Sequence, residues 1–357
     1  MQKTHRLAST RTVFVLYNSM WVLLAKLAMR LRPQKDPFLR FEDAALFRHL
    51  SDRGSLVDPT RTAGRPQFIV TDRPVSPSVA SGGRRVLRSL DSLTDEQVSG
   101  SVFHVYFLCD SDALPVLRRI RTTGGSFLPD ANSSKTDYRF VNRAALEVLQ
   151  KTWSAKDRVS HLKVGVHENL CEALELTKGV PGDYVEIGVY KGGQALTALH
   201  YLRHLEGQGY RERKAWLLDT FDGFTYPQAE SSPDIQWAGT HRLFGAEKTM
   251  RYVRETLTVA GAQFELVRSN ICEEDLPANV KLVSVANIDV DMYEPTFAAL
   301  TKTADRVSPG GMILVEDAAS TPRLYGAYLA LCDFLDTPAG RDFIPIFKSS
   351  QYFLIRK

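Results

Sequence analysis

The sequence has few cysteines and little excess charge. Four cysteines occur among its 357 residues; they are far apart and none belongs to a C-x-x-C pair. That spacing argues against a zinc site or a disulfide framework and is typical of a protein from a reducing compartment. The net charge of +4 gives no indication of a nucleic-acid partner. We therefore expect a cytoplasmic protein that does not bind nucleic acid.

The sequence also lacks a long uninterrupted apolar run. The apolar stretch over residues 12–31 is broken by Asn18, Ser19 and Lys26, and is therefore too short to form a membrane-spanning helix. No clean signal-peptide cleavage site follows it. Its apolar residues recur at helical spacing, which predicts an amphipathic helical segment within residues 1–50. We expect this helix to pack on the body of the protein or on a partner subunit of a homo-oligomer. Membrane contact through its basic residues is the alternative.

Residues 51–150 are expected to form a small α/β accessory domain. The segments "QFIVTD" and "SVFHVYFLC" are typical of strands, and "DALPVLRRIRTTGG" is typical of a helix that ends at glycine. No catalytic constellation is visible in this unit, so its role is left open.

From residue 151 to 357 strands alternate with helices, which is the pattern of a doubly wound α/β sheet. The last two strands are joined by a turn too short for anything but a hairpin, so the last strand is expected to be antiparallel. The predicted fold class is a Rossmann-like, seven-stranded, mostly parallel sheet. Its strands are expected at residues 183–188, 215–219, 263–267, 281–289, 311–317, 342–347 and 351–357.

The segment "GDYVEIGVYKGG", residues 182–193, follows a strand directly with a glycine-rich turn. A dinucleotide site has the pattern G-x-G-x-x-G and holds a pyrophosphate. Here Glu186 precedes the turn, and a carboxylate there would repel phosphate and favour a cation. Asp219, one helix later, stands where an acid accepts hydrogen bonds from ribose hydroxyls. S-adenosylmethionine combines a cation with a ribose, so it is the predicted cofactor. The alternative is that the glycines only allow close helix packing.

Residues at four strand ends are expected to contact this cofactor. Ser269 and Asn270 follow the third strand of the large sheet, where contacts to the adenine are expected. The predicted cofactor-binding residues are Glu186, Gly188, Tyr190, Gly192, Gly193, Asp219, Thr220, Ser269, Asn270 and Asp289.

A second group of acids ends the next two strands, in "NIDVDMYEPT" and "SPGGMILVEDAA". These strands are expected to be neighbours, so Asp289, Asp291, Glu316 and Asp317 should converge beside the cofactor. Oxygen ligands without histidine or cysteine favour Mg²⁺. Such an ion could hold two substrate hydroxyls while an aspartate takes the proton. The alternative for Asp291 is that it favours the start of the following helix.

These motifs resemble the macrocin O-methyltransferase family over about residues 155–357. The resemblance rests on "VPGDYVEIGVYKGG", "LLDTFDGF", "NIDVDMYEPT", "SPGGMILVEDAA" and "QYFLIRK", in this order. It implies S-adenosylmethionine and Mg²⁺ as cofactors, with Asp219 at the ribose. It implies Asp289, Glu316 and Asp317 as metal ligands and Asp289 or Asp291 as the base. Glu316 departs from the family pattern, which usually has aspartate there.

The long loop over residues 223–245 resembles a lid over this site. Tyr226 and Trp237 could stack on a sugar or an aglycone. His241 is a further candidate base, although the simpler expectation for a loop histidine is that it faces solvent.

The predicted function is O-methylation of a hydroxyl on a sugar of a small glycosylated natural product or glycoconjugate. Two alternatives remain: a non-catalytic cofactor-binding protein in assembly or regulation, and an NAD-dependent enzyme, which the chemistry of the turn disfavours.

Overall fold

The computed structural model describes residues 64–72, 84–107, 109–127, 140, 143–155, 160, 162–210, 212–320, 324–348 and 351–357. The predicted amphipathic helix within residues 1–50 lies outside them. Among the described helices, none is both long and apolar enough to cross a membrane.

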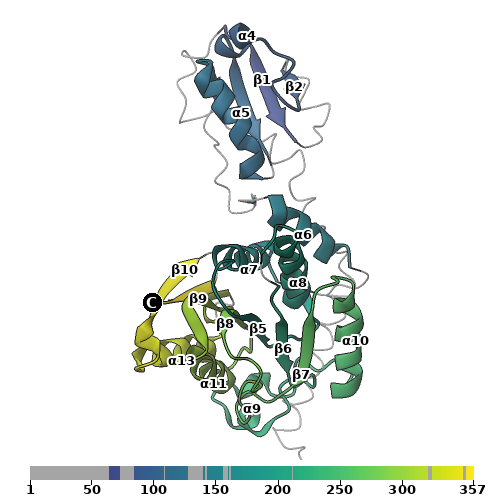
Figure 1. The fold of residues 1–357 in the computed structure, drawn as a ribbon, viewed down its shortest axis with the longest axis vertical. Coiled ribbons are helices and arrows are strands. Elements are labelled where there is room, and N and C mark those ends of the chain that lie inside the picture. Colours follow the sequence, from purple (N-terminus) through teal and green to yellow (C-terminus); the bar gives the residue numbers. More distant parts are fainter. Residues whose placement is uncertain are drawn as a thin grey trace, which may run out of the picture. The chain divides into compact units, whose positions relative to one another are not determined.

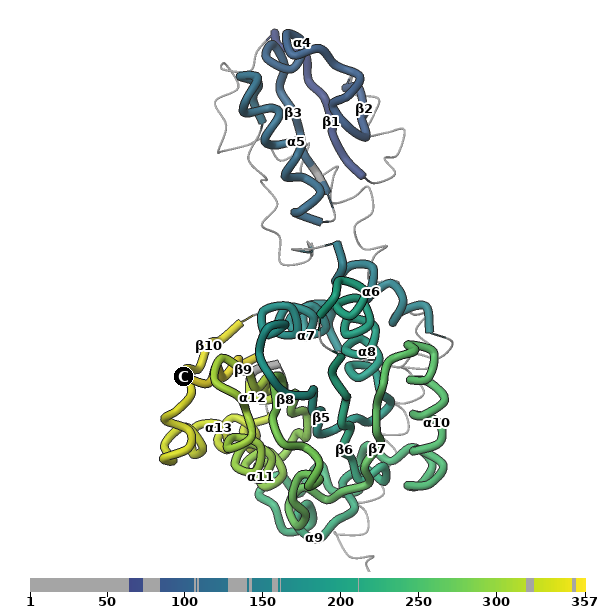
Figure 2. Tube along the Cα trace, in the orientation of Figure 1, coloured from purple at the N-terminus to yellow at the C-terminus, as the bar shows by residue number. Residues whose placement is uncertain are grey.

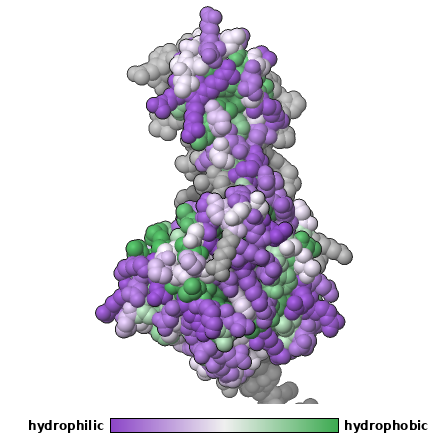
Figure 3. Space-filling view, in the orientation of Figure 1, coloured by the Kyte–Doolittle hydropathy of each residue, from purple (hydrophilic) through white to green (hydrophobic). Residues whose placement is uncertain are grey.

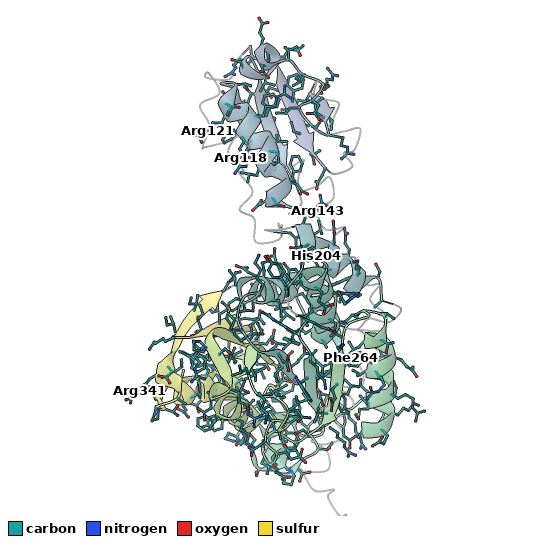
Figure 4. The ribbon with its side chains drawn as sticks, in the orientation of Figure 1. Arg118, Arg121, Arg143, His204, Phe264 and Arg341 are labelled. Atoms are coloured by element: carbon teal, nitrogen blue, oxygen red, sulfur yellow. The ribbon has the colours of Figure 1, made fainter. Side chains whose placement is uncertain are left out.

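The first described unit is a small sheet of four parallel strands in the order β2-β1-β3-β4 (Figure 2). Helix α5 buries Ala113, Val116 and Ile120 against this sheet, whereas Arg118 and Arg121 project outward from it (Figure 4). The predicted strands and helix are thus confirmed, and β2, β4 and α4 are additional. The elements are β1 (Gln67–Thr71), β2 (Arg85–Leu87), α4 (Asp95–Ser99), β3 (Val102–Tyr106), α5 (Asp110–Thr122) and β4 (Ser126–Phe127).

The second unit contains a seven-stranded sheet in the order β10-β11-β9-β8-β5-β6-β7 (Figure 1). Strand β11 pairs antiparallel with β9 and β10, and the other neighbouring pairs are parallel. The predicted fold class is therefore confirmed. The strands are β5 (Asp183–Ile187), β6 (Ala215–Asp219), β7 (Phe264–Arg268), β8 (Val283–Ile288), β9 (Val307–Val315), β10 (Phe343–Lys348) and β11 (Gln351–Arg356).

Helices cover both faces of this sheet (Figure 1). Helices α6, α7 and α8 pack together, and α11 packs with α13. Because both faces are covered, β8 is buried along its whole length. The helices are α6 (Arg143–Trp153), α7 (Val164–Leu176), α8 (Gly193–Glu206), α9 (Pro227–Ser231), α10 (Ala246–Thr258), α11 (Tyr293–Ala304), α12 (Asp317–Ser320) and α13 (Tyr325–Asp336), with short 3₁₀ turns η3 (Ile235–Trp237) and η4 (Gly340–Asp342).

Two predicted boundaries need adjustment. The strand expected over residues 311–317 begins earlier, at Val307, because the Gly310–Gly311 pair lies within β9 at an irregular register. The domain boundary expected between residues 150 and 151 falls inside α6. Since α6 packs on α7 and α8, and Thr152 is hydrogen bonded to Thr197 of α8, we propose that the second unit begins at or before Arg143.

The strand order creates a crevice at the carboxyl end of the sheet. The chain leaves β5 toward β6 and β7, then returns to add β8 on the other side of β5. In open α/β sheets such a reversal is where ligands bind. The residues that follow β5, β6 and β8 therefore decide what this protein can do.

The far edge of the sheet exposes apolar residues. Ile344, Ile346 and Phe347 on the edge strand β10 are largely exposed, and Figure 3 shows apolar surface over this strand.

Candidate active site

A pocket with about 630 Å³ of empty space, including its open mouth, lies at this crevice. Its walls come from the ends of β5, β6, β7 and β8 and from the loop between β6 and α10. Nine of the predicted site residues line it: Gly188, Tyr190, Asp219, Thr220, His241, Ser269, Asn270, Asp289 and Asp291. The other five predicted site residues are not part of its wall: Glu186, Gly192, Gly193, Glu316 and Asp317.

The glycine-rich turn after β5 is shaped by close backbone contact and by one carboxylate. Gly188 has a φ of 94°, and a Cβ atom there would overlap the carbonyl oxygen of Asp289. Oδ2 of Asp219 accepts hydrogen bonds from the backbone N–H groups of Val189 at 2.7 Å and Tyr190 at 2.8 Å. Oδ1 accepts the N–H of Phe221 at 2.7 Å. Asp219 thus joins the turn after β5 to the turn after β6.

Glu186 lies inside the sheet rather than on the pocket wall. It is 1% exposed and accepts a hydrogen bond from the Tyr184 hydroxyl. Burial raises the pKa of Glu186 to about 8, so the side chain is mostly protonated at neutral pH. The buried, mostly protonated side chain of Glu186 therefore does not support a charged contact with a cationic ligand, and its role in cofactor binding stays a prediction. Its role in the structure is a buried hydrogen bond between side chains of β5.

We expect replacement of Glu186 by glutamine to change how stability depends on pH. The unfolded chain releases this proton above about 4.5 and the folded chain only near 8, so the folded state loses stability as pH rises between these values. The variant cannot ionise there, so it should gain up to about 4 kcal/mol relative to wild type between pH 5 and 8. Urea denaturation at both pH values measures this.

Glu255→Gln, on the exposed face of α10, is the control and should follow the wild type. Parallel pH curves for wild type and Glu186→Gln would contradict the assignment.

Three carboxylates meet beside the pocket. Oxygens of Asp289, Glu316 and Asp317 all lie within 4.8 Å of one another, and the latter two side chains are almost completely buried. The pKa of Asp289 is raised, first by burial and then by the neighbouring charges of Asp317 and Glu316. Buried carboxylates at this distance repel one another, and a divalent cation would remove that repulsion. The oxygen-only ligand set and its burial fit Mg²⁺.

Asp291 connects this acidic cluster to the pocket. Its backbone has a φ of 60°, and its N–H donates to Oδ2 of Asp317 at 2.7 Å. Burial, followed by the charges of Asp317 and Glu316, raises the pKa of its carboxyl group. The carboxylate itself lies 4.0 Å from Nε2 of His241.

His241 is packed into the pocket wall, so the expectation of a solvent-facing histidine is wrong. Its side chain is 33% exposed, and its ring makes edge contacts with Tyr190 at 5.2 Å and Phe224 at 5.1 Å between centroids. The Thr240 hydroxyl donates to the carbonyl of Trp237 at 2.7 Å, so it accepts from Nδ1 of His241 at 2.9 Å. In the neutral ring this arrangement places the proton on Nδ1 and the lone pair on Nε2.

Backbone strain is concentrated around this pocket. Within the described residues, four that are not glycine have a positive φ: Tyr190, Phe221, His241 and Asp291. All four line the pocket. Such conformations cost about 1–3 kcal/mol each and cluster at functional sites. Their common location supports the assignment of the pocket as the active site.

Sequence reasoning missed several contributors. Phe221 and Phe224 line the pocket, as do Thr249, Ile271, Val290 and Pro295. The motif "DTFDGF" could have indicated the two phenylalanines. Gln194 carried no sequence signal at all, yet its Nε2 donates to Oδ2 of Asp289 at 2.7 Å. Tyr226 lines the pocket, whereas Trp237 does not line it and packs against the cluster of Phe224, Ala229 and Met292.

The strand order, the glycine turn at the reversal point and the acid that ends β6 define a Rossmann-like methyltransferase. The chain belongs to the macrocin-O-methyltransferase (TylF) family, whose model matches residues 142–334. It is accordingly an O-methyltransferase.

Named relatives agree with this membership. The chain is 31% identical over 180 residues to 8-demethyl-8-(2,3-dimethoxy-alpha-L-rhamnosyl)-tetracenomycin-C 4'-O-methyltransferase of Streptomyces olivaceus, covering 48% of this chain and 67% of that one. It is 28% identical to mycinamicin III 3''-O-methyltransferase of Micromonospora griseorubida, covering 49% and 71%. Among solved structures, the O-methyltransferase NovP matches with 22% identity and a TM-score of 0.47, covering 56% of this chain and 83% of that chain.

Proposed function

We propose that this protein transfers a methyl group from S-adenosylmethionine to a sugar hydroxyl of a small glycosylated natural product or glycoconjugate, assisted by Mg²⁺. One observation carries the proposal: a single pocket adjoins both the turn clamped by Asp219 and the acidic cluster of Asp289, Glu316 and Asp317. The named relatives act on glycosylated compounds, which supports this substrate class.

The wall formed by β5, β6 and β7 suits the adenosine end of the cofactor. Asp219 lies where a carboxylate can accept ribose hydroxyls in addition to its backbone donors. The Ser269 hydroxyl is buried in this wall and has no hydrogen-bond partner among the described residues. A buried polar group of this kind calls for a ligand partner. Thr220, Tyr190 and Asn270 complete this proposed cofactor surface.

Asp289, Glu316 and Asp317 are the proposed metal ligands. A Mg²⁺ ion held there would lower the pKa of a bound acceptor hydroxyl and fix its orientation. Glu316 replaces the usual aspartate and still lies within the cluster, so its longer side chain does not remove it from the ligand set.

Deprotonation of the acceptor hydroxyl is assigned to the residues between the cluster and the lid. Asp289 and Asp291 are carboxylate candidates, and His241 offers Nε2 as the basic nitrogen of its favoured tautomer. The oxygen then displaces the methyl group from the sulfonium in line, so one carbon–sulfur bond breaks as one carbon–oxygen bond forms.

The remaining parts of the chain are assigned by proposal only. We propose that an accessory domain lies between residue 51 and the start of α6 at Arg143, that the protein acts in the cytoplasm, and that it forms a homo-oligomer. A non-catalytic cofactor-binding role is disfavoured by family membership, and an NAD-dependent reaction by the lack of G-x-G-x-x-G.

Calorimetry and mass spectrometry test the proposed function. S-adenosylhomocysteine should bind to the purified protein and NAD should not, because the turn after β5 lacks the pyrophosphate pattern. Glycosylated acceptors incubated with S-adenosylmethionine should gain one methyl group. Absence of S-adenosylhomocysteine binding, or binding of NAD in its place, would overturn the proposal.

A further inference from the structure

A buried pair of amide side chains lies directly behind the proposed metal ligand Asp289. Gln194 is near the start of α8 and is 4% exposed, and Asn287 on β8 is completely buried. Nδ2 of Asn287 donates to Oε1 of Gln194 at 3.1 Å, and Nε2 of Gln194 donates to Oδ2 of Asp289 at 2.7 Å. Helix α8 is thereby joined to the end of β8.

The direction of these hydrogen bonds is determined by chemistry. As a ligand of a cation Asp289 is ionised and can only accept, so Gln194 must present its NH₂ group to it. Its carbonyl oxygen is then turned toward Asn287, where it receives an N–H. A glutamine side chain in water samples many rotamers, and the Asn287 contact selects one of them. The amide of Gln194 is thus held in place before any ligand binds.

We propose that Gln194 is a positioning residue that fixes the orientation of Asp289 for the metal ion and the acceptor hydroxyl, and that Asn287 anchors it. This inference rests on the proposed function. Groups that hydrogen bond to a metal ligand set its orientation, and their loss typically costs about 10–100-fold in metal affinity or activity. Neither amide lines the pocket, so neither is expected to touch the cofactor.

Replacement of Gln194 by methionine tests the inference, because methionine has similar length and lacks the amide. With saturating S-adenosylhomocysteine, the Kd for Mg²⁺ measured by calorimetry should rise about 10–100-fold, and kcat should fall by a similar factor. The Kd for S-adenosylhomocysteine should stay within about threefold of wild type, a pattern that general destabilisation would not produce.

Thr197→Val is the matched control. Thr197 is also buried on α8 and hydrogen bonded, to His167 and Thr152, but it does not contact the acidic cluster. Its Kd for Mg²⁺ and its kcat should remain within about twofold of wild type.

Asn287→Leu provides a second variant that leaves Gln194 in place. It should weaken Mg²⁺ binding and kcat in the same direction but less, and it should add no further loss in the Gln194→Met background, because both residues act through one contact. If Gln194→Met does not fold, the Kd for Mg²⁺ and the kcat of Asn287→Leu test the inference in its place.

The two failures are distinguishable. If the proposed function is wrong, the wild-type protein neither binds S-adenosylhomocysteine nor transfers methyl groups. If only the present inference is wrong, Gln194→Met, or Asn287→Leu in its place, retains the wild-type Kd for Mg²⁺ and the wild-type kcat.

Discussion

Replacement of Asp317 by asparagine is expected to abolish methyl transfer while cofactor binding survives. Asp317 contributes one of the three clustered carboxylates, and its Oδ2 also holds the backbone of Asp291. Asparagine keeps the size of the side chain but removes its charge, so a divalent cation loses one anionic ligand. The loss of several kcal/mol of charge stabilisation corresponds to a fall in turnover on the order of 10³-fold.

Turnover assays and calorimetry separate the two effects. The variant should bind S-adenosylhomocysteine within a few-fold of wild type, since Asp317 does not line the pocket. A chelator should reproduce the loss in the wild type, and added Mg²⁺ should reverse it. Asp305→Asn, an exposed acid at the end of α11, is the control and should remain active. A fully active chelated enzyme would overturn the metal assignment.

The second large effect is expected from Gly188→Ala, and it concerns stability. An alanine Cβ would overlap the carbonyl oxygen of Asp289 at a φ of 94°. The backbone of Asp289 cannot move away easily, because its N–H donates a hydrogen bond to the carbonyl oxygen of Ile187 at 2.9 Å. We expect a loss of about 4 kcal/mol or more, which lowers the melting temperature by roughly 8 °C or more.

Gly209→Ala separates the overlap from the backbone conformation. Gly209 has a φ of 82°, but a Cβ there would meet no atom within 4 Å. This variant should lose only the intrinsic cost of a left-handed residue, about 1 kcal/mol. Equal melting temperatures for the two variants would show that the close approach at Gly188 does not matter.

The sheet could be predicted because local pattern and fold agree. β6 matches its predicted range residue for residue, and β5 differs by one residue, since short, largely apolar runs are typical of buried parallel strands. The antiparallel direction of β11 followed from the length of its turn. Helix α6 and the earlier start of β9 were missed because they depend on packing and on pairing with β8.

The sequence predicted which acidic residues lie at the site. It did not predict their protonation or their hydrogen-bond partners. The grouping of Asp289, Glu316 and Asp317 followed from the ends of neighbouring strands. The protonation of Glu186 could not be predicted, because it depends on burial inside the sheet. The contact between Gln194 and Asn287 joins residues 93 positions apart on a helix and a strand, and no local pattern encodes such a contact.

Asp219 couples the turn after β5 to the turn after β6. Its two oxygens receive three backbone donors from two separate turns, so those turns are mechanically linked. A ligand that takes a share of this carboxylate redistributes hydrogen bonding in both turns at once. Cofactor binding would therefore change the hydrogen bonding of Tyr190 and, through the ring contact between Tyr190 and His241, the packing of His241, before any acceptor binds.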